Sequence, residues 1–323
     1  MDLRSIFINN VGRLRSGWRV LIFVLAFVAT GFLITTALRV LYALLLWVFP
    51  SLPYANFIEN VIFRFELLAT ALIAAYLCLR LLEGLPWRAL GLTFHDHWFR
   101  DLLVGSVIGI ASLALGVGVA FIGGGLKFNL NRADLILGVA RSLLSSGTLF
   151  MIAALAEEAI FRGYPLQTLT RAGLAWMGVL LTSLPFAFSH LLNPNVVPGV
   201  TFANTALAGI WLAVAYLRTR SLWFPLGVHW GWNWALGSLF DLPVSGLHLV
   251  SRPLLEATDT GPGWLTGGSY GLEGGVAGTV ALLLSTLFIW RIRFVSATPE
   301  MLKLTSEENR ATPSHVLTIR PTE

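Results

Sequence analysis

The chain has 323 residues, of which 56% are hydrophobic and only 12% are charged. Soluble globular proteins carry about 25% charged residues, so this composition excludes a soluble domain and indicates an integral membrane protein. The formal net charge is +5, but most Arg residues stand in short segments between apolar runs, as the positive-inside rule predicts. We therefore expect the lipid bilayer as a partner and no nucleic acid. The single cysteine, Cys78, excludes an internal disulfide and a cysteine metal cluster.

A helix needs about 20 apolar residues to cross the hydrocarbon core of a bilayer. Such segments recur along the chain, and the first follows several Arg residues without a small-residue cleavage site, which favours a retained span over a signal peptide. The pattern predicts an all-α fold, a polytopic integral membrane helical bundle with about eight transmembrane helices. The predicted spans are residues 20–48, 58–81, 101–122, 135–160, 174–191, 203–217, 222–240 and 274–291.

The distribution of basic residues predicts the orientation. With eight crossings, only Lys127, Arg132 and Arg252 fall in the loops of one side, and the remaining basic clusters fall on the other. The positive-inside rule then places both termini in the cytoplasm. Because the loops are short and no organelle-type targeting segment stands out, we expect a multi-pass protein of a prokaryotic plasma membrane.

The chain has no internal repeat and no separate soluble domain. We expect residues 1–295 to form one transmembrane bundle and residues 296–323 to be a polar, disordered cytoplasmic tail. Residues 242–272, rich in Gly, Pro, Ser and Thr, are predicted to be an irregular external loop.

The stretch "AEEAIFRGYP" at residues 156–165 places charges at the end of an apolar run. Ionisable residues inside a membrane are costly and indicate function by default. Glu158 and Arg162 are four residues apart, so on a helix they share a face and can pair. Glu157 has no cation at either helical spacing, because Ile160 and Phe161 occupy those positions. One carboxylate is therefore predicted to be neutralised and the other to face a different partner.

Two further spans carry polar residues. His190 lies in "FAFSHLLNP", and His229 and Asn233 are four residues apart on one face of another span. A glutamate can take a proton from water, histidine can orient that water or bind a metal, and His and Asn can donate to an oxyanion. Together these residues favour hydrolysis. Ser189 precedes His190 without a nucleophile elbow, so serine catalysis fits less well.

Each of these features also has a structural interpretation. The pair of Glu158 and Arg162 is by itself more often a structural ion pair, and a lone intramembrane histidine usually packs and bonds to a neighbour. A transporter would also place carboxylates and histidines in its spans, but the absence of a visible repeat argues against it. The hydrolytic hypothesis therefore rests on the combination of the glutamates, histidines and asparagine on three helices, and not on any one of them.

Three motifs resemble the CPBP family, which comprises the CaaX prenyl endopeptidases and the bacteriocin-processing or Abi-type membrane proteins. "EEAIFR" matches EExxxR, "FAFSH" matches FxxxH, and "HWGWN" matches HxxxN, in this order over about residues 145–240. The resemblance implies an intramembrane endopeptidase, and we expect a membrane-associated or lipidated peptide or protein as its substrate. It implies that Glu157 activates water, that His190 helps to hold it, that His229 and Asn233 bind the oxyanion, and that Glu158 and Arg162 support the site. The alternative is a non-enzymatic immunity or scaffold protein with a structural polar cluster.

The cofactor is either none or zinc. Glu157, His190 and His229 would supply a His₂Glu set, which several zinc peptidases use. The helix motif H-E-x-x-H that presents two ligands and a base together is missing, and Glu158 is paired with Arg162 rather than free to act as the base. We therefore favour a site without metal.

Overall fold

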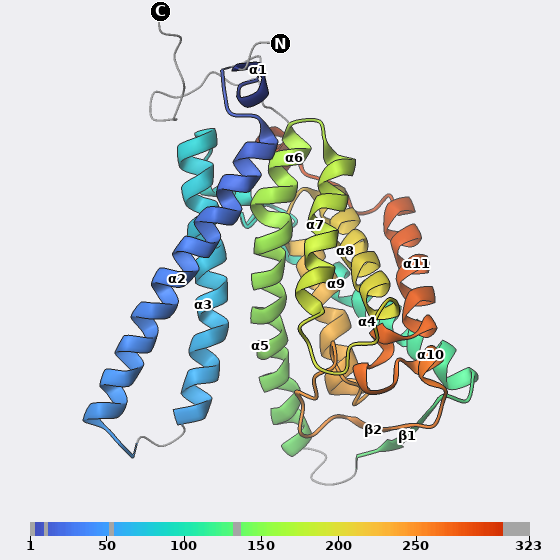
Figure 1. The fold of residues 1–323 in the computed structure, drawn as a ribbon. Coiled ribbons are helices and arrows are strands. Elements are labelled where there is room, and N and C mark those ends of the chain that lie inside the picture. The colour runs from blue at the N-terminus through green and yellow to red at the C-terminus, as the bar shows by residue number, and fades with distance from the viewer. Residues whose placement is uncertain (1–3, 10–11, 52–54, 132–136, 306–323) are drawn as a thin grey trace, which may run out of the picture.

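The computed structural model describes residues 4–9, 12–51, 55–131 and 137–305, and it is a mostly helical bundle (Figure 1). Apolar helices occur at all the predicted positions. The long ones are α2 (Ser16–Val48), α3 (Ala55–Cys78), α4 (Trp98–Ile122), α5 (Gly138–Glu158), α7 (Ala175–His190), α8 (Val200–Thr219), α9 (Trp223–Trp234) and α11 (Val276–Arg291). The short ones are α1 (Arg4–Phe7), η1 (Leu79–Glu83), η2 (Trp87–Leu90), η3 (Ala159–Leu166), α6 (Gln167–Arg171), η4 (Ala235–Leu239), α10 (Gly263–Thr266), η5 (Gly268–Tyr270), η6 (Leu272–Gly274) and α12 (Pro299–Thr305).

Five helical segments in the described part of the chain are long and apolar enough to cross a membrane. Two of them combine consecutive elements: α3 runs on into η1, and α5 runs through η3 into α6. The remaining three apolar helices, α7, α9 and α11, have only 16, 12 and 16 residues. The count of eight crossings and the cytoplasmic placement of both termini stay predictions.

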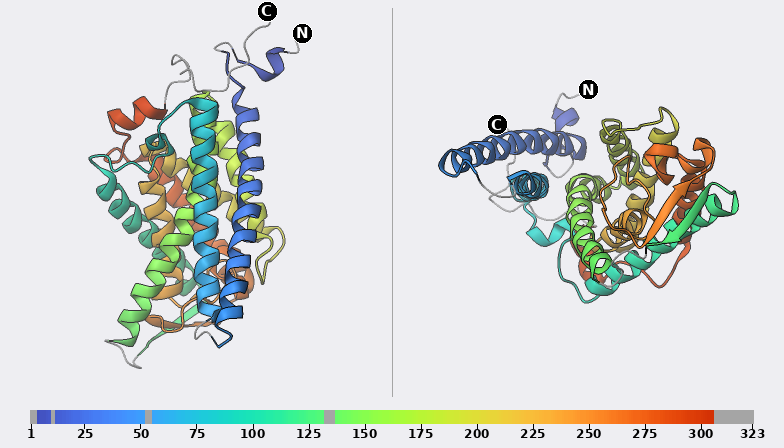
Figure 2. Two further views of the ribbon diagram at one scale, coloured as in Figure 1. Left: turned by 90° about the vertical axis from the view of Figure 1, so that its left-hand side faces the viewer. Right: turned by 90° about the horizontal axis from the view of Figure 1, so that it is seen from below.

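The pair α2 and α3 stands at one side of the bundle, which Figures 1 and 2 show from three directions. Large apolar side chains along α2, among them Leu25, Phe32 and Trp47, are exposed. An apolar surface of this extent is unfavourable in water and is typical of a helix that faces lipid.

The helices α4 and α9 approach each other through glycines. Gly105 and Gly109 lie one turn apart on α4, and Gly227 and Gly231 do so on α9. A Cβ atom at Gly109 would lie only 2.2 Å from the carbonyl oxygen of Val228. Small residues at a four-residue spacing allow the backbones of two membrane helices to pack this closely. The contact fixes α9, the helix that carries His229 and Asn233.

The prediction of a purely α-helical chain needs correction. Strands β1 (Leu126–Leu130) and β2 (Leu255–Asp259) form an antiparallel pair, in which Leu126 is opposite Asp259. This pair lies at the end of the bundle opposite the start of α2 (Figures 1 and 2). The segment 242–272, expected to be irregular, contains β2, α10 and η5, because pairing with β1 satisfies backbone groups that would otherwise need water.

The first part of the predicted disordered tail is also ordered. Residues Pro299–Thr305 form α12, in which the side chains of Met301 and Thr305 are buried. Burial of these side chains stabilises a segment whose polar composition alone suggested disorder. Residues 306–323 lie outside the described residues.

A buried ionic network joins α2 to the continuation of α5. Glu83 lies 3.1 Å from Arg19 of α2, also contacts Arg171 of α6, and accepts a hydrogen bond of 2.7 Å from Thr168. The charged side chains are almost completely buried. Arg19 and Arg171 belong to the basic clusters that indicate orientation in the sequence. In the structure, their two guanidinium groups share one carboxylate and so compensate its burial. The network thus fixes the helix that carries the Glu157–Arg162 motif against α2.

Candidate active site

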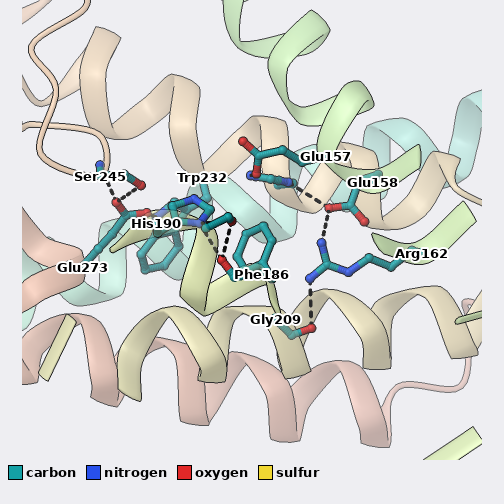
Figure 3. Close-up of polar contacts among 11 residues, drawn as sticks. Glu157, Glu158, Arg162, Phe186, His190, Gly209, Trp232, Ser245 and Glu273 are labelled. Atoms are coloured by element: carbon teal, nitrogen blue, oxygen red, sulfur yellow. Dashed lines mark hydrogen bonds and ion pairs between the residues drawn. The ribbon is translucent and has the colours of Figure 1, made fainter. Parts of the chain in front are cut away.

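Glu158 and Arg162 form the buried ion pair of the site. Glu158 is the last residue of α5, and Arg162 lies in the following π-helical segment η3, a type of segment often found at functional sites. The Arg162 guanidinium donates to Glu158 Oε1 at 3.1 Å and to the Gly209 carbonyl oxygen at 3.0 Å (Figure 3). It also lies 4.6 Å from the centre of the Phe186 ring. Both side chains are 0% exposed, so the pairing expected from their spacing is present and is shielded from solvent.

His229 of α9 lies between the two carboxylates of the motif. Its Nδ1 atom is 2.9 Å from Glu158 Oε1, and its Nε2 atom is 3.7 Å from Glu157 Oε2. A carboxylate paired with Arg162 can only accept hydrogen bonds, so Nδ1 is the donor. This bond orients the ring and leaves Nε2 directed toward Glu157.

Glu157 differs from its neighbour in the way the spacing predicts. Its side chain is 28% exposed, whereas that of Glu158 is 0% exposed. Its Oε2 atom has no hydrogen-bond partner among the described residues. The separation of 3.7 Å from His229 exceeds a direct hydrogen bond, but one water about 2.8 Å from each atom would bridge them.

His190 ends α7 and contributes the second imidazole. Its Nδ1 atom lies 2.8 Å from the Phe186 carbonyl oxygen. A carbonyl oxygen only accepts, so Nδ1 carries the proton and Nε2 carries the lone pair. The Phe186 side chain also packs near both histidines. The centre of its ring lies 4.5 Å from the centre of the His190 ring and 6.2 Å from the centre of the His229 ring.

The four predicted residues line one cavity of about 540 Å³. Glu157, His190, His229 and Asn233 all contribute to its wall. They come from α5, α7 and α9, although Pro185 lies inside α7 and Pro165 lies just beyond the motif in η3. The π-helical segment η3 directly follows α5, and η4 directly follows α9. The three helices therefore converge on one cavity, as the hydrolytic hypothesis requires.

Sequence analysis missed a further acidic residue of this cavity, Glu273 in η6. Glu273 accepts hydrogen bonds from Trp232 Nε1 at 3.0 Å and from the backbone and hydroxyl of Ser245 at 2.7 and 3.0 Å. Burial, and then the Glu273 charge, raises the pKa of the nearby Tyr270 to about 12, so that phenol stays neutral. Glu273 lies in the glycine-rich stretch "GLEGG" and has no partner at helical spacing. In the sequence, the feature that could have drawn attention to Glu273 is that this carboxylate stands directly before the last apolar run.

The histidine tautomers would suit a metal ligand, since an occupied Nδ1 atom leaves Nε2 free to coordinate. Within the described residues, however, no three His, Cys, Asp or Glu side chains are grouped closely enough to hold a metal ion. Glu157, His190 and His229, the candidate zinc ligands, therefore line the same cavity without being grouped as a ligand set in the described structure. The choice between a metal site and a metal-free site stays a prediction.

Comparison with known proteins supports the resemblance to the CPBP family. Residues 138–235 match the family model "Type II CAAX prenyl endopeptidase Rce1-like". That match covers all three motifs, and together with the long apolar helices it fits an integral membrane protein. The chain is also 34% identical over 89 residues to an Escherichia coli protein described as "Uncharacterized 24.3 kDa protein". The alignment covers 27% of this chain and 40% of that relative's length. No solved structure matches the chain.

Proposed function

We propose that the protein is a membrane-embedded endopeptidase that hydrolyses a peptide bond with a water activated by Glu157. The observation that carries this proposal is the position of Glu157, which lines the cavity and whose Oε2 atom lies 3.7 Å from His229 Nε2 and has no hydrogen-bond partner among the described residues. A carboxylate in this position can take a proton from a water and later give it to the leaving amine.

The other residues have complementary roles in this proposal. His190, with its Nε2 lone pair, helps to hold the water. His229 and Asn233 donate hydrogen bonds to the oxyanion that forms when the water attacks the carbonyl. Because Nδ1 of His229 already donates to Glu158, Nε2 donates only from an imidazolium, and the carboxylates on either side attract that cation. Glu158 and Arg162 hold His229 in position.

The family match and the surroundings of the cavity support a proposal for the substrate class. The matched model describes endopeptidases that act on CaaX prenyl proteins, and the cavity lining includes Phe27 of α2 and Leu67 of α3, which belong to the lipid-facing pair of helices. We propose a membrane-associated or lipidated peptide as substrate, in a prokaryotic plasma membrane.

Cleavage of a quenched, farnesylated CaaX peptide by the purified protein tests this function. The Glu157→Gln variant keeps the shape of the side chain and removes the base, so we expect turnover to fall about 10²- to 10⁴-fold. The matched control is Glu256→Gln, which removes one carboxylate from the exposed face of β2. Near wild-type turnover by the Glu157→Gln variant would refute the assignment. A folded wild-type protein without peptidase activity on any lipidated or membrane-associated peptide would favour the immunity or scaffold alternative.

A further inference from the structure

The cavity carries negative charge at two separated places. Figure 3 shows Glu157 and Glu273 on opposite sides of His190, and both carboxylates line the same cavity. The proposed reaction uses Glu157 and assigns no task to Glu273. Its position in η6, the short helix just before α11, places its charge in the cavity that the proposed catalytic groups line.

The Glu273 carboxylate is held rigidly by neutral groups. The Trp232 indole donates a hydrogen bond to one carboxylate oxygen, and the backbone N–H and hydroxyl of Ser245 both donate to the other. The backbone at Glu273 is fixed as well, because the side-chain amide of Asn204 donates to the backbone carbonyl of Glu273 at 2.8 Å. A carboxylate has about four acceptor positions, so it retains the capacity to bind one more donor.

Among the described residues, no Lys or Arg balances this charge, and the imidazole of His229 is paired with Glu157 and Glu158 instead. Neither Lys nor Arg contributes to the cavity wall, and Glu273 forms no ion pair with any described residue. A half-buried carboxylate without a counter-charge is unfavourable inside a membrane protein unless a partner compensates it. Three fixed donors lower that cost, but they leave the net negative charge of the cavity in place.

We propose that Glu273, held by Trp232 and Ser245, forms a subsite for a cationic group of the substrate, the ammonium or guanidinium of a peptide. This inference rests on the proposed peptidase function and extends it to the substrate class: peptides with a basic group near the cleaved bond. Charge-assisted hydrogen bonds to a fixed carboxylate are among the stronger polar contacts in proteins. A peptide carboxylate placed in the same subsite is repelled.

Peptide binding to the purified Glu157→Gln protein tests the subsite. In this background Glu273 is the remaining carboxylate of the described cavity wall, and turnover is too slow to deplete the peptide during a binding measurement. The probes are fluorescent, N-acetylated apolar peptides that carry one lysine or one norleucine at each position in turn. We expect the best lysine peptide to bind about 10- to 100-fold more tightly than its norleucine counterpart. A norleucine peptide with a free N-terminus shows whether the α-amine supplies the cation instead.

The variants assign the preference to one residue. The preference should disappear in Glu157→Gln/Glu273→Gln and persist in Glu157→Gln/Glu256→Gln, which loses a carboxylate outside the cavity. If the first double variant does not fold, Glu157→Gln/Glu273→Asp keeps the charge but moves it, and the preference should shrink. Equal binding of lysine, free-amine and norleucine peptides, or a preference unchanged by substitution of Glu273, would overturn the proposal.

The two proposals fail in different ways. A preference for cationic peptides in a wild-type protein that cleaves none of them contradicts the peptidase function alone. Cleavage by the wild-type protein without any preference for a basic group contradicts the subsite alone.

Discussion

Replacing Glu158 should destabilise the fold, because Glu158 is the only described acidic partner of the buried Arg162. Its Oε1 atom accepts from Arg162 Nη1 at 3.1 Å and from His229 Nδ1 at 2.9 Å, and both members of the ion pair are 0% exposed. In Glu158→Gln the amide oxygen still accepts one hydrogen bond, but the negative charge is lost. Removing one partner of a buried ion pair costs about 3–5 kcal/mol.

A double-mutant cycle separates this charge effect from a loss of packing. In Glu158→Gln/Arg162→Met no buried charge is left uncompensated, and the methionine keeps an apolar contact with Phe186, over which the guanidinium lies at 4.6 Å. We therefore expect the double variant to be more stable than Glu158→Gln, because replacing a whole buried pair is often nearly neutral.

Thermal unfolding of the purified protein in one detergent measures these differences, compared at a single heating rate because membrane proteins often unfold irreversibly. The adjacent variant Glu157→Gln is the matched control, since Glu157 Oε2 has no hydrogen-bond partner in the described structure. We expect it to melt close to wild type, whereas Glu158→Gln melts clearly lower and loses activity in parallel. Equal melting temperatures for the two glutamine variants would refute the reasoning that assigns the two carboxylates different roles.

The remaining predictions concern packing, pH, metal content and topology. Gly109→Ala should destabilise the fold strongly and lower activity, because its Cβ atom would lie 2.2 Å from the Val228 carbonyl oxygen; unchanged melting and activity would contradict the close packing of α4 and α9. Burial lowers the pKa of His95 below its ordinary value of 6.5, so the unfolded chain binds more protons and stability should fall as the pH drops through about 6.5. His95→Gln should flatten that dependence in thermal melts from pH 7.5 to pH 5.5, whereas a change of the exposed His248 to Gln should not. Elemental analysis of the active protein should find no stoichiometric zinc, and zinc whose removal abolishes activity and whose return restores it would contradict the metal-free site. Reporter fusions after residue 125 and after residue 323 should report opposite sides of the membrane; the same side would overturn the eight-span topology.

The sequence determined the features that depend on composition and on local helical geometry. Apolar runs predicted the positions of the helices, because a helix in lipid must satisfy its backbone internally and present apolar side chains. The four-residue spacing predicted the pair of Glu158 and Arg162 and the different environment of Glu157, because those relations lie within one turn. The three motifs predicted the family resemblance that the match over residues 138–235 supports.

The tertiary structure alone decided which distant residues meet. His229 contacts a carboxylate 71 positions earlier in the chain, and Glu273 reaches Trp232 across 41 positions. Helix packing sets such contacts, above all the glycine-mediated approach of α4 and α9, and no periodicity along the chain encodes its geometry. The pairing of β1 with β2 and the burial of Arg19 beside Glu83 have the same origin. Each depends on a partner far away in sequence, whereas hydropathy and spacing describe only neighbours along the chain.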